Sequence, residues 1–168
     1  MYMIRPAAQR DLPALTILYQ QLDHVHAAAE PSLIPTPDEL PRRQEDIEET
    51  IRDPLAPMFV AVQHPDDGDD DDEPRVVGFA KVRIRQLGRY WRVERMPEVD
   101  ELAVVEDVRG QGVGGMLMAA AEEWARGAGF PEIWVAAWAF NTPASSLYQR
   151  QGFEPLNTRF RKRLSDGD

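Results

Sequence analysis

Residues 102–117, LAVVEDVRGQGVGGML, contain the features that decide the fold. An apolar run leads through a short acidic turn into a glycine-rich loop, and apolar residues then recur at helical spacing from Val113 to Trp124. This order predicts a buried strand, a loop and a helix that stops at Gly127 and Gly129. Because the glycines leave backbone N–H groups at the helix start uncovered by side chains, the helix N-terminus is a candidate anion site, and phosphate is the usual ligand of such a site.

Several phosphate loops share glycine patterns of this kind. A Walker A loop is excluded because its Lys-Ser/Thr pair is absent. Gly110, Gly112 and Gly115 satisfy the Gly-x-Gly-x-x-Gly pattern of dinucleotide folds. Such a fold also needs an acid at the end of the next strand to bind the ribose, and residues 133–138 lack one. The remaining pattern is Arg-x-x-Gly-x-Gly, which begins at Arg109. A loop without a ligand is disfavoured, because each glycine lowers helix stability by about 1 kcal/mol.

The composition predicts one globular domain over residues 1–168, with 43% hydrophobic residues. No apolar run approaches the roughly 20 residues of a membrane helix, and no secretory h-region is present, so we expect a cytoplasmic protein without a membrane partner. The absence of cysteine excludes disulfides and thiolate catalysis, and no cluster of ligands predicts a metal. The net charge of −10 argues against nucleic acid and suits a cationic substrate, although it also serves solubility.

The chain alternates between strand and helix patterns. Strands are expected at residues 2–6, 58–62, 76–85, 98–105, 133–138 and 158–164, and helices at residues 11–22, 37–53, 113–127 and 142–151. Residues 64–75 are strongly acidic and are expected to form a disordered hairpin loop between two antiparallel strands. Arg83 and Arg85 belong to a local basic stretch, which we interpret as an exposed strand face that answers nearby acids.

Residues 98–153 resemble the Gcn5-related N-acetyltransferase (GNAT) family in the order and spacing of their motifs. The match comprises the strand at 102–104, the loop from Arg109 to Gly114 with its helix, and Asn141 followed by Leu-Tyr-x-x-x-Gly-Phe at 147–153. The N-terminal third matches only in the order of its elements. The resemblance implies an α/β fold, the GNAT fold, with a splayed mixed sheet of six to seven strands flanked by about four helices. Acetyl-CoA would lie in the split between two parallel strands.

The resemblance also implies which residues bind acetyl-CoA. Backbone groups of the strand would pair with the pantetheine arm, which mimics a peptide. The loop would hold the pyrophosphate through its N–H groups, and the last helix would contact the far side of the cofactor. The residues concerned are Leu102, Ala103, Val104, Arg109, Gly110, Gln111, Gly112, Val113, Gly114, Asn141, Ser145 and Tyr148.

The implied reaction is a direct transfer of the acetyl group to a primary amine. A lysine-like amine has a pKa near 10.4 and must lose a proton before it attacks, so a base is required. Strand alternation puts Glu98 and Asp100 on one face and Glu101 on the other. Asp100 is the first candidate base, followed by Glu98 and Glu101. Tyr148 would lie near the sulfur as general acid, because a hydroxyl of pKa about 10 can return a proton to the leaving thiolate.

A further group of residues would bind the amine acceptor. His24 and His26 fall between the first two expected helices, in a stretch that borders the acceptor in similar chains, and Glu101 would join them there. The acceptor could be a small-molecule or peptide amine, and the resemblance also allows a homodimer. A non-catalytic acyl-CoA sensor with the same fold is the alternative function, because fold does not fix activity.

Overall fold

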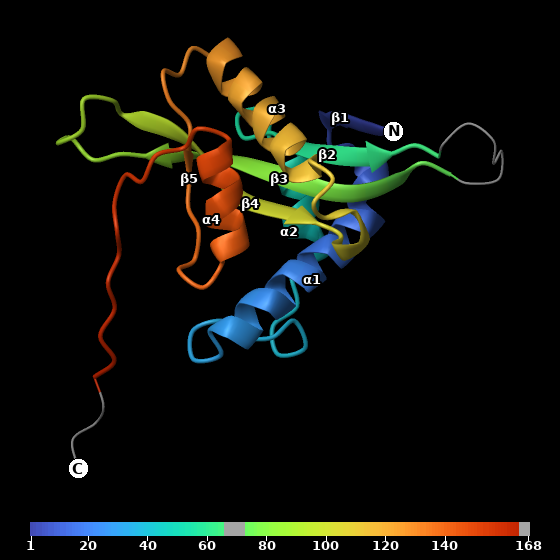
Figure 1. Ribbon diagram of the computed structural model, residues 1–168, viewed down its shortest axis with the longest axis horizontal. Coiled ribbons are helices and arrows are strands. Elements are labelled where there is room, and N and C mark those ends of the chain that lie inside the picture. The colour runs from blue at the N-terminus through green and yellow to red at the C-terminus, as the bar shows by residue number, and fades with distance from the viewer. Residues whose placement is uncertain (66–72, 165–168) are drawn as a thin grey trace.

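The computed structural model describes residues 1–65 and 73–164 (Figure 1). Its centre is a mixed sheet in the order β1-β2-β3-β4-β5, in which the first three pairings are antiparallel and β4 pairs with β5 in parallel. The strands are β1 (Tyr2–Pro6), β2 (Met58–Gln63), β3 (Arg75–Gln86), β4 (Arg95–Val104) and β5 (Trp134–Val135). The expected mixed α/β fold is confirmed, but the described residues form a sheet of five strands rather than six to seven.

In the described ranges four α-helices flank the sheet, as expected, and two short 3₁₀ helices connect elements. They are η1 (Gln9–Asp11), α1 (Leu12–Ala29), α2 (Gln44–Arg52), η2 (Glu106–Val108), α3 (Val113–Gly127) and α4 (Thr142–Arg150). One buried cluster joins α3 to the sheet, and Tyr148 of α4 packs against it. A second cluster joins α1 and α2 to the sheet through Leu15, Leu18 and Ile47. The sheet therefore separates two cores, with α3 and α4 on one face and α1 and α2 on the other (Figure 1).

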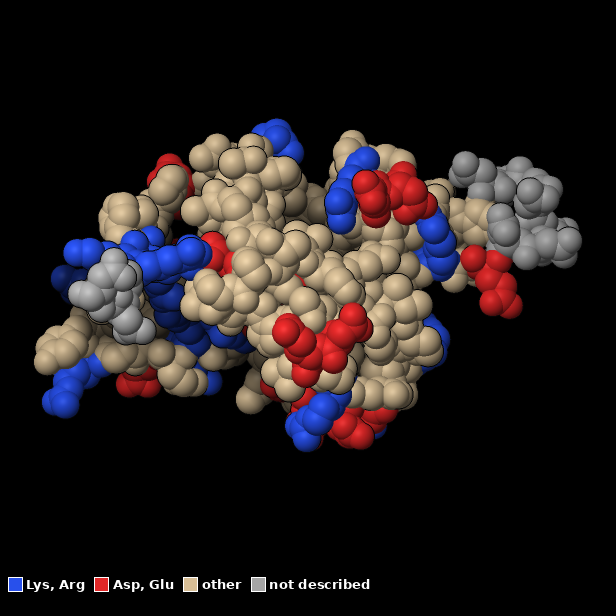
Figure 2. Space-filling view, turned by 90° about the horizontal axis from the view of Figure 1, so that it is seen from below, with Lys and Arg blue, Asp and Glu red and all other residues tan. Residues whose placement is uncertain are grey.

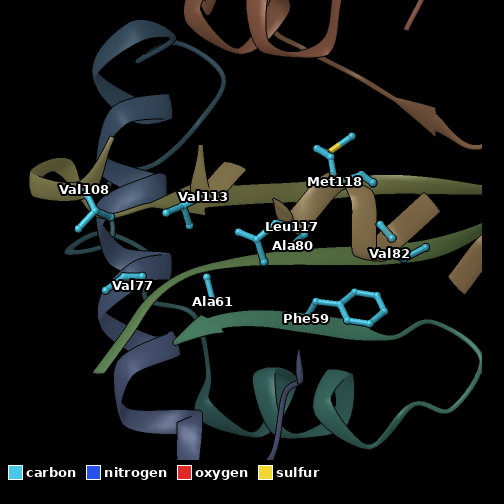
Figure 3. Packing of buried hydrophobic residues seen from close by; sticks show 11 residues of the cluster. Phe59, Ala61, Val77, Ala80, Val82, Val108, Val113, Leu117 and Met118 are labelled. Atoms are coloured by element: carbon cyan, nitrogen blue, oxygen red, sulfur yellow. The ribbon is translucent and has the colours of Figure 1, made fainter. Parts of the chain in front are cut away.

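The core beneath α3 follows from the helical spacing of its apolar residues. Val113, Leu117 and Ala121 lie one turn apart, and each is fully or almost fully buried. Figure 3 shows Val113 and Leu117 turned toward the strand that carries Val77 and Ala80. Burial of a leucine side chain contributes about 1.5–3 kcal/mol, so this contact holds the N-terminal half of α3 in place on the sheet. The loop ahead of α3 is thereby anchored at its C-terminal end.

The first helix is longer than expected, because α1 continues to Ala29 instead of ending near residue 22. Three alanines at 27–29 favour the helix, and Pro31 follows its C-cap. His24 and His26 therefore lie on the helix and not in a loop. Asp11 is the N-cap residue of α1, but its side chain makes no capping hydrogen bond. Its carboxylate accepts hydrogen bonds from both terminal nitrogens of Arg5 at 2.7 Å.

The second helix is shorter than expected, because α2 begins at Gln44 and not near residue 37. The backbone N–H of Thr36 donates to Glu39 Oε2 at 2.8 Å, and Glu39 N–H donates back to Thr36 Oγ1 at 3.3 Å. This exchange forms one turn. Pro41 then disfavours helical geometry at Leu40 and supplies no N–H, so the turn does not grow into a helix.

Of the two strands expected in the last third of the chain, one is shorter than expected and the other does not form. The strand expected at 133–138 consists of Trp134–Val135 alone, and no strand is assigned at 158–164. Within the described parts of the chain, β5 is the last strand of the sheet and pairs with β4 alone, so little pairing holds its flanking residues in a strand. Of the acidic loop expected at 64–75, residues 66–72 lie outside the described residues, and Arg75 is already the first residue of β3. The flanking strands pair antiparallel as expected, with Gln63 opposite Arg75. None of the described helices combines the length and apolarity needed to cross a membrane.

Candidate functional site

The loop before α3 exposes a row of backbone donors. Gly110 and Gly112 have φ values of 79° and 86°, a left-handed conformation that side chains disfavour. A Cβ at either position would meet no atom within 4 Å, so the glycines are needed for conformation and leave open space beside the backbone. Among the described residues, no acceptor pairs with the N–H groups of Gly110, Gly112 or the first three residues of α3. These donors, at the positive end of a helix dipole, suit an anion.

The next two glycines have a different role, because they let α4 approach the start of α3. A Cβ at Gly114 would lie 3.0 Å from Leu147 Cδ2, and a Cβ at Gly115 would lie 3.0 Å from Gln151 Nε2. α4 begins at Thr142, as expected, and Asn141 is its N-cap. The backbone N–H of Ala144 donates a hydrogen bond to Asn141 Oδ1 at 3.1 Å. The Asn141 motif and the glycine loop therefore meet in space.

Side chains of the loop tie it to the sheet. Arg109 Nε donates to the backbone oxygen of Val104 at 3.0 Å, which joins the loop to the end of β4. The Tyr2 hydroxyl donates a hydrogen bond to Gln111 Oε1 at 2.5 Å, which joins the loop to β1. Arg109 and Gln111 thus hold the loop in position, while the unpartnered backbone N–H groups remain the available donors.

β4 has an open stretch, residues 100–104, directly before this loop. β5 pairs with β4 only at Glu98 and Val99, so β4 is unpaired on this side from residue 100 onward among the described residues. On the β3 side, Lys81 faces Glu101 while the adjacent Val82 faces Val99, which leaves Asp100 as the extra residue of a β-bulge. The expected split between parallel strands is therefore present, and a bulge marks the point where it opens.

Glu98, one of the candidate bases, is engaged in ion pairs. It is 3% exposed, and its two oxygens accept from Arg83 at 2.6 Å and from Arg85 at 2.8 Å. Burial raises the pKa of Glu98, but the two guanidiniums outweigh burial and hold that pKa below the ordinary glutamate value. This pairing matches the expectation that the basic strand face answers nearby acids, and it makes Glu98 a poor proton acceptor.

Asp100 and Glu101 lie closer together than simple alternation predicts, because the bulge interrupts the alternation. Lys81 Nζ is 3.4 Å from Asp100 Oδ2 and 3.2 Å from Glu101 Oε2, so both carboxylates face one ammonium group. Arg83 Nε also approaches Asp100, at 3.1 Å. The expectation that Asp100 and Glu101 occupy opposite faces is therefore wrong.

Glu101 belongs to a polar cluster that the sequence did not reveal. The Tyr19 hydroxyl donates to Glu101 Oε2 at 2.9 Å, and Arg42 contacts Glu101 Oε1 at 2.7 Å. Arg42 also pairs with Asp23 at 2.6 Å and covers the Tyr19 ring at 4.3 Å. Burial and the neighbouring Glu101 carboxylate raise the pKa of Tyr19. The only sequence signal was a tyrosine on the apolar face of α1, which indicated core packing.

Tyr148 of α4 is half-buried. Its ring packs against the core beneath α3 and lies 6.1 Å from the Phe153 ring. No hydrogen-bond partner for the hydroxyl occurs among the described residues. Burial raises the pKa of Tyr148 to about 12, so the hydroxyl is protonated at neutral pH. The geometry leaves this donor available to a ligand.

The two histidines differ in their surroundings. His24 is exposed, and its Nδ1 lies 2.8 Å from the backbone oxygen of Gln20 on its own helix. His26 lies 6.3 Å from Trp138 and 6.2 Å from Phe140, and burial lowers its pKa. Trp138 and Phe140 stack on each other in the loop before α4. The structure thus brings His26, but not His24, against an aromatic pair that the sequence prediction did not include. Among the described residues no group of His, Cys, Asp and Glu could hold a metal ion.

Comparison with known proteins agrees with this architecture. The family model described as "Acetyltransferase (GNAT) family" matches residues 20–153. No curated protein matches the sequence significantly. The tetramutant of the BH1408 protein from Bacillus halodurans superposes with a TM-score of 0.81 at 15% identity, covering 96% of this chain and 99% of that chain.

Two similar structures are named as aminoglycoside acetyltransferases. AAC(6′)-Iy in complex with CoA has a TM-score of 0.71 at 23% identity, covering 98% of this chain and 95% of that chain. Meta-AAC0020, from an uncultured soil metagenomic sample and in complex with trehalose, has a TM-score of 0.64 at 20% identity, covering 98% and 97%. Identities this low establish the shared fold only. Because the family model spans most of the 168 residues and the fold agrees with it, the chain belongs to the acetyltransferase (GNAT) family.

Proposed function

We propose that the protein transfers the acetyl group of acetyl-CoA to a primary amine by direct attack of the amine on the thioester. One observation carries the proposal: the unpartnered N–H groups at the start of α3 adjoin the open stretch of β4, and the Arg109–Val104 hydrogen bond joins the two. The first feature suits a pyrophosphate. The second suits the amide groups of a pantetheine arm, which can pair with an open strand as a peptide does.

The residues fit acetyl-CoA on this basis. Backbone donors from Gly110 to Gly114 would hold the pyrophosphate, and the backbone of Leu102, Ala103 and Val104 would hold the pantetheine arm. Asn141 and Ser145 would border the other side, since α4 lies against the same helix N-terminus. When bound, acetyl-CoA supplies an activated acyl group, and the chain's own residues need only orient it and move protons.

The transfer forms a C–N bond and breaks the C–S bond. Asp100 is the proposed base that receives the proton lost by the amine, directly or through water. It is preferred because it lies where β4 and β5 part, and because its ion-pair contacts are longer than those that engage Glu98. Tyr148 is the proposed acid that donates its hydroxyl proton to the departing sulfur. No covalent enzyme intermediate is needed, in keeping with a chain that has no cysteine.

The acceptor is proposed to bind near Glu101 and His26. Glu101 adjoins the bulge at Asp100, and the charges of Glu101 and Asp23 act on His26, which places the histidine near the same cluster. The exposed rings of Trp138 and Phe140 would contact the body of the acceptor. His24 would remain at the edge of this site.

Release of free CoA tests the proposal. Because the chain contains no cysteine, a thiol-specific reagent such as Ellman's reagent reports only the CoA that the reaction releases. Acetyl-CoA is incubated with aminoglycosides, polyamines, amino acids and lysine peptides, each beside its N,N-dimethylated counterpart. The proposal expects release with at least one primary amine and none with its dimethylated counterpart. Binding of acetyl-CoA without release for any amine would favour the acyl-CoA sensor instead.

A further inference from the structure

Lys81 of β3 places an amine between the two carboxylates at the bulge of β4. Its Nζ is 3.4 Å from Asp100 Oδ2 and 3.2 Å from Glu101 Oε2. Among the described residues, β4 parts from β5 beyond Val99, which lies directly before Asp100. Because Asp100 is the proposed base, a primary amine of the chain itself lies beside that base, where the sheet begins to split.

Lys81 is not the only cation that balances these carboxylates. Arg83 Nε lies 3.1 Å from Asp100 Oδ1, and Arg42 Nη2 lies 2.7 Å from Glu101 Oε1. Each carboxylate would therefore keep a guanidinium partner if Lys81 lost its charge. The two Lys81 contacts are longer than these, and its side chain is 23% exposed, so solvent weakens them. We therefore expect the fold to tolerate a neutral side chain at this position.

A cavity of about 300 Å³ between α2 and the sheet borders Lys81. Thr50 of α2 and Asp53, the C-cap of that helix, line the cavity on one side, and Lys81 and Arg83 line it from β3. The Lys81 side chain is thus not enclosed on every side by packed atoms. The cavity leaves room for the small acetyl group that a modified lysine would carry.

We propose that Lys81 is a self-acetylation site, at which the protein transfers the acetyl group of bound acetyl-CoA to its own side chain. The proposal rests on the proposed function, because it uses the same bound thioester and the same base. The amine acceptor must bring its nitrogen to Asp100, and Lys81 Nζ is already there. Lys81 would therefore react when no acceptor occupies the site.

The transfer to Lys81 balances without any further reagent. Lys81 Nζ gives one proton to Asp100 and attacks the thioester carbon, so that the C–N bond forms and the C–S bond breaks. The electron pair of the broken bond stays on sulfur, and Tyr148 donates the proton that completes the thiol. Nitrogen gives up a second proton as the amide forms, and this proton restores Tyr148 through water. The products are acetylated Lys81, the free thiol of CoA and the proton on Asp100, which passes to solvent.

Acetylation would change the charge of the acceptor site. It removes the positive charge and the ammonium donors that Lys81 offers to Asp100 and Glu101. The bulge then presents the two carboxylates with fewer cations beside them, which favours a cationic acceptor. The modification would thus act on the same reaction that produces it.

Mass spectrometry tests the proposal cleanly, because the chain contains only two lysines, Lys81 and Lys162. The purified protein is incubated with acetyl-CoA and no added amine, and the modified residue is located by peptide mapping. We expect a gain of about 42 Da at Lys81, the mass of one acetyl group. Its rate constant should not change with protein concentration, because the reaction takes place within one chain.

Lys162 provides the matched control. It is exposed near the end of the described chain, where Figure 2 shows Lys and Arg side chains gathered. Lys81 should react at least about tenfold faster than Lys162, because only Lys81 meets a bound thioester at high effective concentration. Lys81→Arg keeps the cation and should abolish the fast modification, whereas Lys162→Arg should leave it unchanged. Asp100→Asn should slow it on the order of 10²-fold.

A further variant separates enzymatic from purely chemical acetylation. Gly112→Trp, which fills the open space beside the loop before α3, should reduce the Lys81 rate to that of Lys162. Equal rates at the two lysines in the wild type, or a fast Lys81 reaction that survives Gly112→Trp, would overturn the proposal. Unmodified Lys81 in a protein that binds acetyl-CoA by calorimetry and releases CoA with an added amine would overturn self-acetylation alone. Absence of acetyl-CoA binding would overturn the proposed function as well.

Discussion

Replacement of Tyr148 by phenylalanine isolates a single hydroxyl group. The structure gives that hydroxyl no partner among the described residues, while the ring contributes to the core beneath α3. Phenylalanine keeps the ring and its packing. The free energy of unfolding is therefore expected to change by less than about 1 kcal/mol, because no hydrogen bond is lost. A change in rate can then be assigned to proton donation and not to misfolding.

The expected loss of rate is on the order of 10²-fold. General acid catalysis contributes roughly 10²–10⁴-fold, and the low end applies because a thiolate whose conjugate acid has a pKa near 8.5 departs with little help. A 10²-fold loss corresponds to about 2.7 kcal/mol of transition-state stabilisation. The raised pKa of about 12 keeps the Tyr148 hydroxyl protonated, so titration of this residue should cause no fall in the wild-type rate below about pH 10.

The assay is steady-state thiol release at saturating acetyl-CoA, with the best amine from the panel, between pH 7 and pH 10. Tyr90→Phe serves as the control, because Tyr90 is exposed in the β3–β4 hairpin and should leave kcat unchanged. Thermal unfolding of both variants is followed in parallel. A Tyr148→Phe enzyme with a rate within twofold of wild type would refute the acid role and leave Tyr148 as a packing residue.

Three further substitutions separate stability from chemistry. Glu98→Gln should destabilise the fold by about 2 kcal/mol at pH 7, because it weakens the charged hydrogen bonds that two partly exposed guanidiniums make to one buried carboxylate. Because folding lowers the pKa of Glu98, its carboxylate stabilises the fold above the unfolded-state pKa, and this stabilisation is lost as the pH falls. Denaturant titrations should therefore show that the gap in unfolding free energy between the wild type and Glu98→Gln narrows below about pH 4. A gap that stays constant with pH would contradict this. Asp100→Asn should lower kcat while calorimetry finds the acetyl-CoA affinity unchanged, and an unaltered pH–rate profile would remove Asp100 from the mechanism. Gly112→Ala should cost about 1–2 kcal/mol of strain and weaken acetyl-CoA binding, whereas Gly129→Ala, at a φ of 82° away from the loop, should cost similar stability and leave binding intact.

The sequence predicted the part of the fold that depends on neighbouring residues. The strand, loop and helix around Gly112 are specified within a few residues, by glycines and by helical spacing, and they lie where expected. The caps of α4 are equally local, since Asn141 begins the helix and Gly152, with a φ of 88°, follows its C-cap. In these cases the physical cause and its consequence lie within one stretch of chain.

Features that depend on distant partners escaped prediction. Tyr19 and Glu101 are 82 residues apart, and nothing near either of them indicates that they share a hydrogen bond. The bulge at Asp100 is a property of the pairing between β3 and β4, so simple alternation placed Asp100 and Glu101 on opposite faces. The apolar alternation of residues 158–164 predicted a strand that does not form, because a strand also needs a neighbour to pair with, and none of the described residues provides one.

Acetyl-CoA binding at the start of α3 is the central requirement of the proposed function. Isothermal titration of the purified protein with acetyl-CoA, and separately with NAD, measures this without requiring knowledge of the amine. We expect micromolar binding of acetyl-CoA alone, abolished by Gly112→Trp, which fills the open space beside the loop, and retained by Gly129→Trp. Absence of acetyl-CoA binding, or equal binding by Gly112→Trp, would contradict the proposed site and every catalytic role that rests on it.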